Sequence, residues 1–261
     1  MIHNSAIISK KSKIHKNVSI GPYCIVDDNV EIDEGSELIS NIHISGNTFV
    51  GKNNKFFPFS SIGLIPQDLK YTGEKSKLII GNNNVIREHV TINPGTKDGG
   101  METVIQNKCL IMIGSHIAHD CKISSNVILV NNATLGGHVV IGENAIIGGN
   151  SAVHQFVHIG KNAMIGGMSG VESNIIPYGL YTGIRSDLRG LNIIGLKRKG
   201  LSTKSIYEIN FVFKKIFNSN FTIEANIDKL SINEKEIIEI EEMIIFIKSN
   251  LKRGISKYNN G

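Results

Sequence analysis

Cysteine, tryptophan and proline are scarce in this chain of 261 residues, which has three cysteines, five prolines and no tryptophan. The cysteines, Cys24, Cys109 and Cys121, form no Cys-x-x-Cys pair, which argues against a disulfide framework and a thiolate zinc site. We interpret them as small packing residues. The sequence also lacks the run of about 18 apolar residues that a membrane span needs, and its start lacks signal-peptide order. We therefore expect a cytoplasmic protein without stable membrane insertion.

Positive charge is only mildly in excess, with a net charge of +5 and a sequence pI of about 9.0. An acidic partner such as nucleic acid, anionic lipid or an acidic carrier protein fits this excess. The abundance of Ile, Lys and Asn offers a second explanation in genomic base composition. Charge alone therefore selects no partner.

An apolar residue recurs every six positions through most of the first 171 residues. The series comprises Ile2, Ile8, Ile14, Ile20, Val26, Ile32, Leu38, Ile44, Val50, Phe56 and Ile62, then Ile80, Ile86 and Ile92, and then Ile105, Ile111, Ile117, Ile123, Leu129, Leu135, Ile141, Ile147, Val153, Ile159, Ile165 and Val171. A strict hexad predicts a parallel β-helix, in which each hexad supplies one short strand and one turn. One aliphatic side chain per hexad then points into the coil.

The hexad is interrupted at residues 64–78 and 94–103, where Pro, Gly and charged residues replace the inward aliphatics. We expect loops there, either tolerated insertions or lids over a site. After Pro177 the hexad stops, and helical spacing follows from Ser202 and again from Asn233, with Ser202 and Asn233 as the expected caps. The predicted domains are a β-helix over 1–180 and a helical domain over 181–261.

Five of the nine histidines lie between Ile111 and Gly160. If three hexads make one turn, residues 18 apart stack above one another. His119, Gly137 and Gln155 then form one column, Asp120 and His138 form the next, and His154 lies beside Gln155. Because His116 precedes His119 by three residues, four histidines converge on one side of the coil.

This cluster favours acyl transfer. A neutral imidazole at His119 can take a hydroxyl proton near neutral pH, and Asp120 can orient it. A free backbone N–H at Gly137 can stabilise an oxyanion. No Ser or Cys nucleophile is evident, so direct transfer is preferred. Two alternatives stay open: a metal-dependent hydratase, since histidine clusters bind zinc, and a purely structural solenoid.

The segments "HIAHDC", "NNATLGGHV", "AVHQF", "IGGMSGV", "PQDLKY" and "GLKRKG" together resemble the UDP-N-acetylglucosamine O-acyltransferase family of lipid A biosynthesis over nearly the whole chain. The resemblance implies a left-handed β-helix capped by C-terminal helices, assembled as a homotrimer with sites between subunits. It also implies transfer of an (R)-3-hydroxyacyl group from acyl carrier protein to the 3-hydroxyl of UDP-N-acetylglucosamine. It implies no cofactor, no metal and no nucleic acid.

The resemblance also assigns roles to residues of this chain. It makes His119 the general base and Gly137 the oxyanion donor. The remaining implied site residues are Asp68 and Lys70 at the sugar, His116, His138, His154 and Gln155 along the cleft, Asn192 and Arg198 at the nucleotide, and Gly167 at the acyl-length position. Lacking a side chain, Gly167 favours a longer acyl chain. The basic stretch Lys197–Lys199 fits an acidic carrier protein.

The chain departs from the family pattern at three places: Asn93-Pro94-Gly95, Arg185 and Ile194. The first bears on sugar or acyl contacts and the others on the uridine pocket. The choice between the hydroxyl sugar and its 3-amino analogue therefore stays open. A second rival is another hexad acyltransferase that uses acetyl-CoA or forms an amide, which the long helical tail disfavours.

Overall fold

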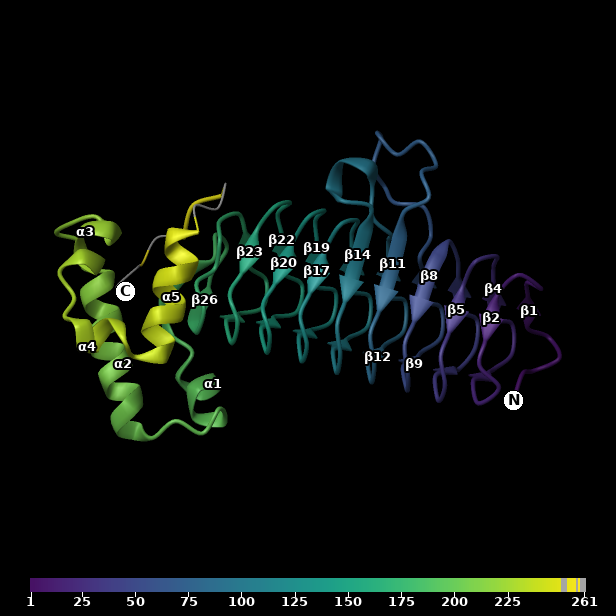
Figure 1. Cartoon of the computed structure of the whole chain (residues 1–261), viewed down its shortest axis with the longest axis horizontal. Coiled ribbons are helices and arrows are strands. Elements are labelled where there is room, and N and C mark those ends of the chain that lie inside the picture. Colours follow the sequence, from purple (N-terminus) through teal and green to yellow (C-terminus); the bar gives the residue numbers. More distant parts are fainter. Residues whose placement is uncertain (250–252, 257, 259–261) are drawn as a thin grey trace.

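The first two thirds of the chain wind into a three-sided, left-handed parallel β-helix, and helices gather at its C-terminal end (Figure 1). The computed structural model describes residues 1–249, 253–256 and 258. Most strands contain two residues, because each hexad spends its other positions on a turn. The predicted fold class is confirmed.

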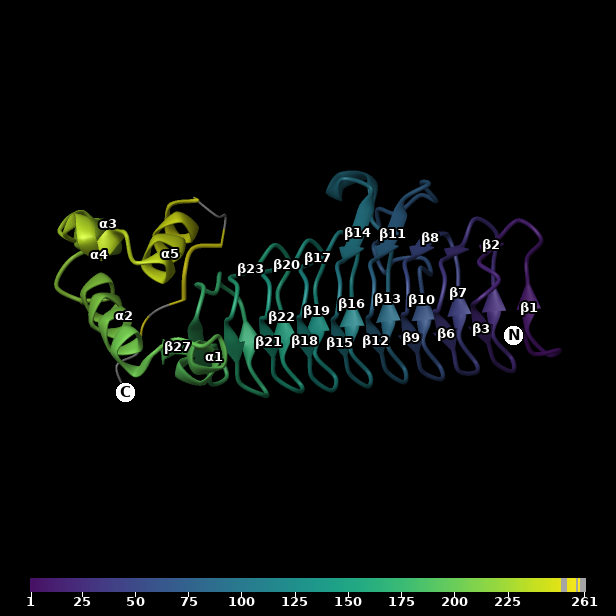
Figure 2. The same cartoon turned by 60° about the horizontal axis from the view of Figure 1, so that its bottom comes forward.

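Each side of the coil is one sheet, and Figure 2 shows strands of the three sheets in three rows. The first face comprises β1 (Ile7–Ile8), β4 (Ile25–Val26), β7 (His43–Ile44), β10 (Ser61–Ile62), β13 (Thr91–Ile92), β16 (His116–Ile117), β19 (Thr134–Leu135), β22 (Ala152–Val153) and β25 (Gly170–Val171). The second face comprises β2 (Lys13–Ile14), β5 (Glu31–Ile32), β8 (Asn47–Val50), β11 (Lys77–Ile80), β14 (Glu102–Ile105), β17 (Lys122–Ile123), β20 (Val140–Ile141) and β23 (His158–Ile159). The third face comprises β3 (Ser19–Ile20), β6 (Glu37–Leu38), β9 (Lys55–Phe56), β12 (Val85–Ile86), β15 (Leu110–Ile111), β18 (Ile128–Leu129), β21 (Ile146–Ile147), β24 (Met164–Ile165), β26 (Gly179–Thr182) and β27 (Asp187–Leu191).

The predicted register of 18 residues per coil is confirmed over the site, where Ile117 pairs with Leu135 and Ile123 pairs with Ile141. The hexad aliphatics fill the axis, and from Ile20 onward they are almost completely buried. The second inward position is small or apolar, as at Cys121, which is fully buried. All three cysteines are free and buried, as packing residues should be.

The turns between faces form three corners, which we number by the faces they join. The first corner joins the first and second faces, the second corner joins the second and third, and the third corner joins the third and first. Many corner residues have a left-handed backbone, and asparagine, which tolerates that conformation well, fills nine such positions among the described residues. Asn29 is one of them at the first corner, but from β16 onward the left-handed residues of that corner are Asp120, His138 and Phe156, with φ of 60°, 62° and 65°.

Both interruptions of the hexad are loops that leave the coil beside β11 and β14 (Figure 1), but they end earlier than predicted, because residues 77–78 begin β11 and residues 102–103 begin β14. The first loop covers residues 63–76. The second loop covers residues 93–101 and contains a short 3₁₀ turn, Lys97–Gly99. The loops contact each other, since the Lys97 N–H donates to Glu74 Oε1 at 2.9 Å.

Five helices follow the coil: α1 (Ile193–Arg198), α2 (Thr203–Ile216), α3 (Ile223–Asp228), α4 (Ile232–Lys235) and α5 (Ile238–Lys248). Ser202 caps α2, as predicted, and Ile209, Phe213 and Ile216 of α2 are buried. The predicted cap at Asn233 is wrong. Asn233 lies within α4, which begins with a Ser231–Glu234 capping box, and α4 ends before α5. Positions 250 and 251 of the predicted second helix lie outside the described residues.

The junction between coil and helices is held by β26 and β27, which pair antiparallel from Gly179 onward, and by an ion-pair network. Glu242 of α5 pairs with Lys161 and accepts a hydrogen bond from Tyr178. Burial, followed by contact with Glu242, raises the pKa of Tyr178. No helix within the described part of the chain has the length and apolar content to cross a membrane.

Candidate active site

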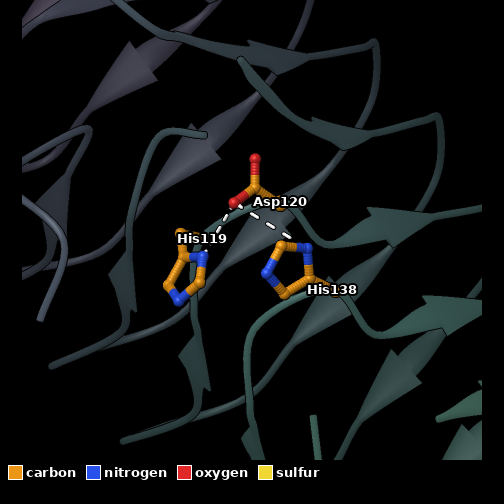
Figure 3. A group of neighbouring side chains, drawn as sticks. All are labelled: His119, Asp120 and His138. Atoms are coloured by element: carbon orange, nitrogen blue, oxygen red, sulfur yellow. Dashed lines mark hydrogen bonds and ion pairs between the residues drawn. The ribbon is translucent and has the colours of Figure 1, made fainter. Parts of the chain in front are cut away.

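His119 and Asp120 form a buried pair at the first corner (Figure 3). His119 Nδ1 lies 2.7 Å from Asp120 Oδ2, and the two side chains are 10% and 0% exposed. An ionised carboxylate only accepts hydrogen bonds, so Nδ1 carries the proton and Nε2 of the neutral ring is a free acceptor. The arrangement is that of a general base oriented by a carboxylate.

Asp120 is enclosed by donors from the second loop. Its Oδ1 accepts from the Thr96 N–H at 2.8 Å, and its Oδ2 accepts from Thr96 Oγ1 at 2.6 Å. Burial raises the pKa of Asp120, but the hydrogen bonds from His119 and Thr96 outweigh burial and hold the pKa below its ordinary value. The carboxylate is therefore ionised at neutral pH.

His138 completes the cluster, one coil further along. Its ring meets that of His119 edge-on with centroids 5.0 Å apart, and it stacks on Phe156 at 4.3 Å. Its Nδ1 lies 4.0 Å from Asp120 Oδ2. Burial lowers the pKa of His138, while the Asp120 charge raises it to a smaller extent. His138 is therefore neutral at pH 7.

Gly137 lies directly under the His119 ring, as the predicted column requires. A Cβ on Gly137 would stand 2.5 Å from His119 Cε1 and 2.6 Å from Nε2. Gly137 is buried, and its N–H donates to no acceptor within the described residues. Because a buried donor without a partner is costly, this N–H is available to donate to an oxygen atom of a bound molecule.

His116 lies on β16 beside the corner, and its Nδ1 is 2.7 Å from Thr91 Oγ1. Burial, and to a smaller extent His119, lowers the pKa of His116. The structure therefore brings His116, His119, Asp120, Gly137 and His138 together, as the register predicted.

His154 and Gln155 lie one coil beyond His138 and are exposed. Arg253, from the C-terminal segment, reaches both: its Nη2 lies 2.6 Å from His154 Nδ1, and its Nε donates to the Gln155 carbonyl oxygen at 3.0 Å. Arg253 was not predicted from the sequence, because no repeat relates a residue after the last helix to the coil.

Asp68 and Lys70 lie on the first loop near this corner. The Lys70 N–H donates to Asp68 Oδ1 at 3.0 Å, and Lys70 Nζ lies 3.8 Å from Asp98 Oδ2 on the second loop. The charges of Asp68 and Asp98 are also felt at His138, where both act to raise the pKa. The first loop therefore borders the histidine cluster.

Asn192, Arg198 and Gly167 lie elsewhere in the same chain. Asn192 caps α1 by accepting from the Gly195 N–H at 3.0 Å, and it donates to the Asn162 carbonyl oxygen. Asn192 and Arg198 line a groove of about 730 Å³ between α1 and the third face. Gly167 is exposed at the third corner. Within one chain, these three residues do not share the first corner with His119.

The three residues of the basic stretch Lys197–Lys199 differ in their contacts. Lys199 Nζ lies 2.8 Å from Glu239 Oε1 and 3.2 Å from the Tyr178 hydroxyl. Lys199 therefore serves the junction with the helices. Lys197 and Arg198 remain exposed on α1.

The cluster of His119, Asp120 and His138 also meets the distance requirement for a metal site, with one ligand atom from each lying within 4.8 Å of the others. However, both carboxylate oxygens of Asp120 already accept hydrogen bonds, and Oδ2 accepts two. The observed contacts therefore fit a base and its orienting carboxylate better than a set of metal ligands.

Comparison with known proteins identifies the class of protein to which the chain belongs. A model described as "Bacterial transferase hexapeptide (six repeats)" matches residues 102–137 and 138–173, and one described as "Udp N-acetylglucosamine O-acyltransferase; Domain 2" matches residues 174–256. The three-sided coil and its matched repeats define a hexapeptide-repeat transferase.

Individual relatives are similar to this chain over nearly its full length. A UDP-N-acetylglucosamine O-acyltransferase of Thermodesulfovibrio yellowstonii is 47% identical, with 98% of this chain and 99% of the relative covered. The solved Francisella novicida UDP-N-acetylglucosamine acyltransferase is 37% identical, with a TM-score of 0.94 and coverage of 100% and 95%. The Campylobacter jejuni enzyme is 35% identical, with a TM-score of 0.92 and coverage of 99% and 100%. The chain belongs to the UDP-N-acetylglucosamine O-acyltransferase family and is an acyltransferase, as its motifs predicted.

Proposed function

We propose that this chain transfers an (R)-3-hydroxyacyl group from acyl carrier protein to the 3-hydroxyl of UDP-N-acetylglucosamine, the first step of lipid A biosynthesis, with His119 as general base. The names of two relatives, at 47% and 38% identity, give an acylated acyl carrier protein as donor and UDP-N-acetylglucosamine as acceptor. The observation that carries the mechanism is the buried His119–Asp120 pair beside the unpaired N–H of Gly137.

In this mechanism His119 Nε2 takes the proton of the sugar hydroxyl while the hydroxyl oxygen attacks the thioester carbonyl carbon. The negative charge moves to the carbonyl oxygen, where the Gly137 N–H stabilises it by about 3–4 kcal/mol. The tetrahedral intermediate collapses by breaking the carbon–sulfur bond. The imidazolium then returns its proton to the departing thiolate.

Asp120 supports the charged ring. Its carboxylate, 2.7 Å from Nδ1, favours the protonated ring of the transition state without itself becoming protonated. His116 and His138 are kept neutral by burial, so they add no positive charge that would oppose protonation of His119. They are available to hydrogen-bond the sugar.

The positions of the side chains support the remaining substrate contacts that we propose. Asp68 and Lys70 on the first loop hold the sugar, and His154 and Gln155 extend the cleft along the coil. Arg198 offers a guanidinium to the nucleotide phosphates, with Asn192 in the same groove. Lys197 and Arg198 meet the acidic carrier protein.

We also propose that the working unit is a homotrimer with sites between subunits. The base lies at the first corner, whereas the groove beside Arg198 borders the third face, so one substrate pair reaches both only where two chains meet. The outward side chains of the third face are apolar and half-buried along the stretch that a partner would cover. They are Val85, Leu110, Ile128, Ile146, Met164 and Leu180.

The acyl chain runs toward the third corner of the neighbouring subunit, where Gly167 leaves it open. A Cβ there would meet only the Gly149 backbone, at 3.2 Å from its carbonyl oxygen, so a larger side chain requires a shift of a few tenths of an ångström at Gly149. Gly167→Met should shift the preferred donor to a shorter acyl chain. The reaction needs no cofactor, because the thioester is already activated.

The experiment that tests the proposal offers a ladder of hydroxyacyl carrier proteins with UDP-N-acetylglucosamine or its 3-amino analogue, and identifies the products by mass spectrometry. His119→Ala should lower kcat by about 10²–10⁴. His43→Ala is the matched control, since His43 forms a 2.7 Å pair with Asp27 and lies three coils before His116 on the first face. Wild-type turnover in His119→Ala would remove the general base from the proposal.

A further inference from the structure

The second loop, residues 93–101, contacts the Asp120 carboxylate through Thr96. Thr96 is only 2% exposed although it belongs to a loop. It gives Asp120 two hydrogen bonds, from its N–H to Oδ1 at 2.8 Å and from its hydroxyl to Oδ2 at 2.6 Å. Two donors on two different oxygens fix both the position and the plane of the carboxylate.

The rest of the loop keeps Thr96 in place and leaves no free space. The Thr96 carbonyl oxygen accepts from the N–H groups of Gly99 and Met101, at 3.1 and 3.0 Å. A Cβ on Gly99 would overlap the Asp120 carboxyl group. From the coil, fully buried Thr103 accepts the Asp120 N–H at 2.8 Å. The carboxylate is thus held between loop and coil.

We propose that Thr96 is a positioning residue for acyl transfer, which holds the Asp120 carboxylate where it orients the His119 ring. The second loop then contributes to catalysis indirectly, because the Thr96 hydroxyl acts through Asp120 and not on the substrate. This inference rests on the proposed function, because it assumes that the His119–Asp120 pair acts in catalysis.

The physical consequence of losing the hydroxyl is specific. Asp120 Oδ2 would keep only its bond to His119 Nδ1, and the carboxylate could rotate. The pKa of Asp120 would rise, because a hydrogen bond from Thr96 is one of the interactions that lower it. Among the described residues, the other ionisable groups that interact with the carboxylate are His119, His138 and buried Cys121 on the coil, while Asp68 and Asp98 act on His138 from the loops.

The test compares Thr96→Val, which removes the hydroxyl at constant shape, with Thr96→Ser, which keeps it. Thr48→Val is the matched control, because Thr48 is 1% exposed and donates to the Ser45 carbonyl oxygen at 2.5 Å in another part of the coil. Thr96→Val should lower kcat about 10- to 100-fold, the rate equivalent of one hydrogen bond to a charged group. The KM values of both substrates should stay within about two-fold, since only positioning changes. Thr96→Ser and Thr48→Val should retain wild-type kcat.

A second readout separates this inference from the proposed function. NMR titration of the Asp120 carboxyl carbon in Thr96→Val should give a raised pKa, and the His119 Nδ1 proton signal should shift. An unchanged titration and wild-type kcat would overturn the role of Thr96. A changed titration with wild-type kcat would instead refute catalysis by the His119–Asp120 pair, and with it the positioning role. If Thr96→Val does not fold, Gly99→Ala tests the same carboxylate by displacing it, and the same two outcomes apply.

Discussion

The His119 ring occupies the space that a side chain on Gly137 would need, with Cε1 only 2.5 Å from the ideal Cβ position. Gly137→Ala should therefore displace the base and obstruct the oxyanion position at once. We expect kcat to fall by at least about 10²-fold, the usual effect of losing one oxyanion donor. Steady-state kinetics would measure the loss, and near-native circular dichroism would show that the coil persists. Activity within two-fold of wild type would contradict the placement of the oxyanion at this N–H.

Stability should fall on mild acidification. Burial lowers the pKa values of His116, His138 and His158 from 6.5, so the unfolded chain binds more protons than the fold as the pH drops. The stabilising contribution is complete above pH 6.5 and is lost as the pH falls through the folded pKa values. Calorimetry between about pH 8 and pH 5 should show a decreasing Tm. His158→Gln, outside the corner, should make that decrease shallower, whereas an identical slope would count against burial as its cause.

Lys197 and Lys199 should respond differently to reversal of charge. Lys199→Glu places a carboxylate beside Glu239 and should lower Tm, by about 2–4 °C for each kcal/mol lost. Lys197→Glu should leave Tm unchanged but weaken binding of the acidic carrier protein, with a marked dependence on salt. Thermal melting and titration calorimetry at two salt concentrations distinguish the two effects. Equal affinity of Lys197→Glu and wild type at low salt would exclude α1 as the docking surface.

Arg253 should control the protonation pattern of His154. Because guanidinium only donates, Nδ1 of His154 is held as an acceptor and Nε2 carries the proton. In Arg253→Ala we expect both tautomers to appear in ¹⁵N spectra and kcat/KM to fall about ten-fold, consistent with one charged hydrogen bond. Arg253→Lys keeps the charge but loses the bidentate contact to His154 and the Gln155 carbonyl oxygen. Its kcat/KM should therefore lie between those of wild type and Arg253→Ala. A single tautomer and wild-type kcat/KM in Arg253→Ala would show that Arg253 does not set the tautomer of His154.

The six-residue repeat of the sequence was sufficient to predict the coil and the cluster of His119, Asp120 and His138 at its first corner. An 18-residue repeat brings His119 over Gly137 and places His138 beside Asp120 without any knowledge of loops. The reason is that each coil of a solenoid stacks on the next, so residues one coil apart in the sequence contact each other in space. The family resemblance supplied the left-handedness, which spacing does not determine.

The partners of these residues could not be predicted in the same way. Thr96 reaches Asp120 from an insertion, and Arg253 reaches His154 from the tail, so neither contact has a period. The pairing of Lys199 with Glu239 depends on how α5 packs against the coil, which the basic stretch alone does not reveal. The cap at Ser231 was missed because two candidate caps lie two residues apart, and only the fold selects between them.

The left-handed residues at the first corner limit how far the thermal stability of this protein can be raised. Asparagine or glycine relaxes that backbone most easily, yet at the first corner the fold keeps Asp120, His138 and Phe156 there. A variant chosen only for heat resistance would drift toward asparagine or glycine at these positions. The coil of such a variant would melt at a higher temperature but would lose acyl transfer. Thermal stability and turnover therefore place opposite demands on these three residues.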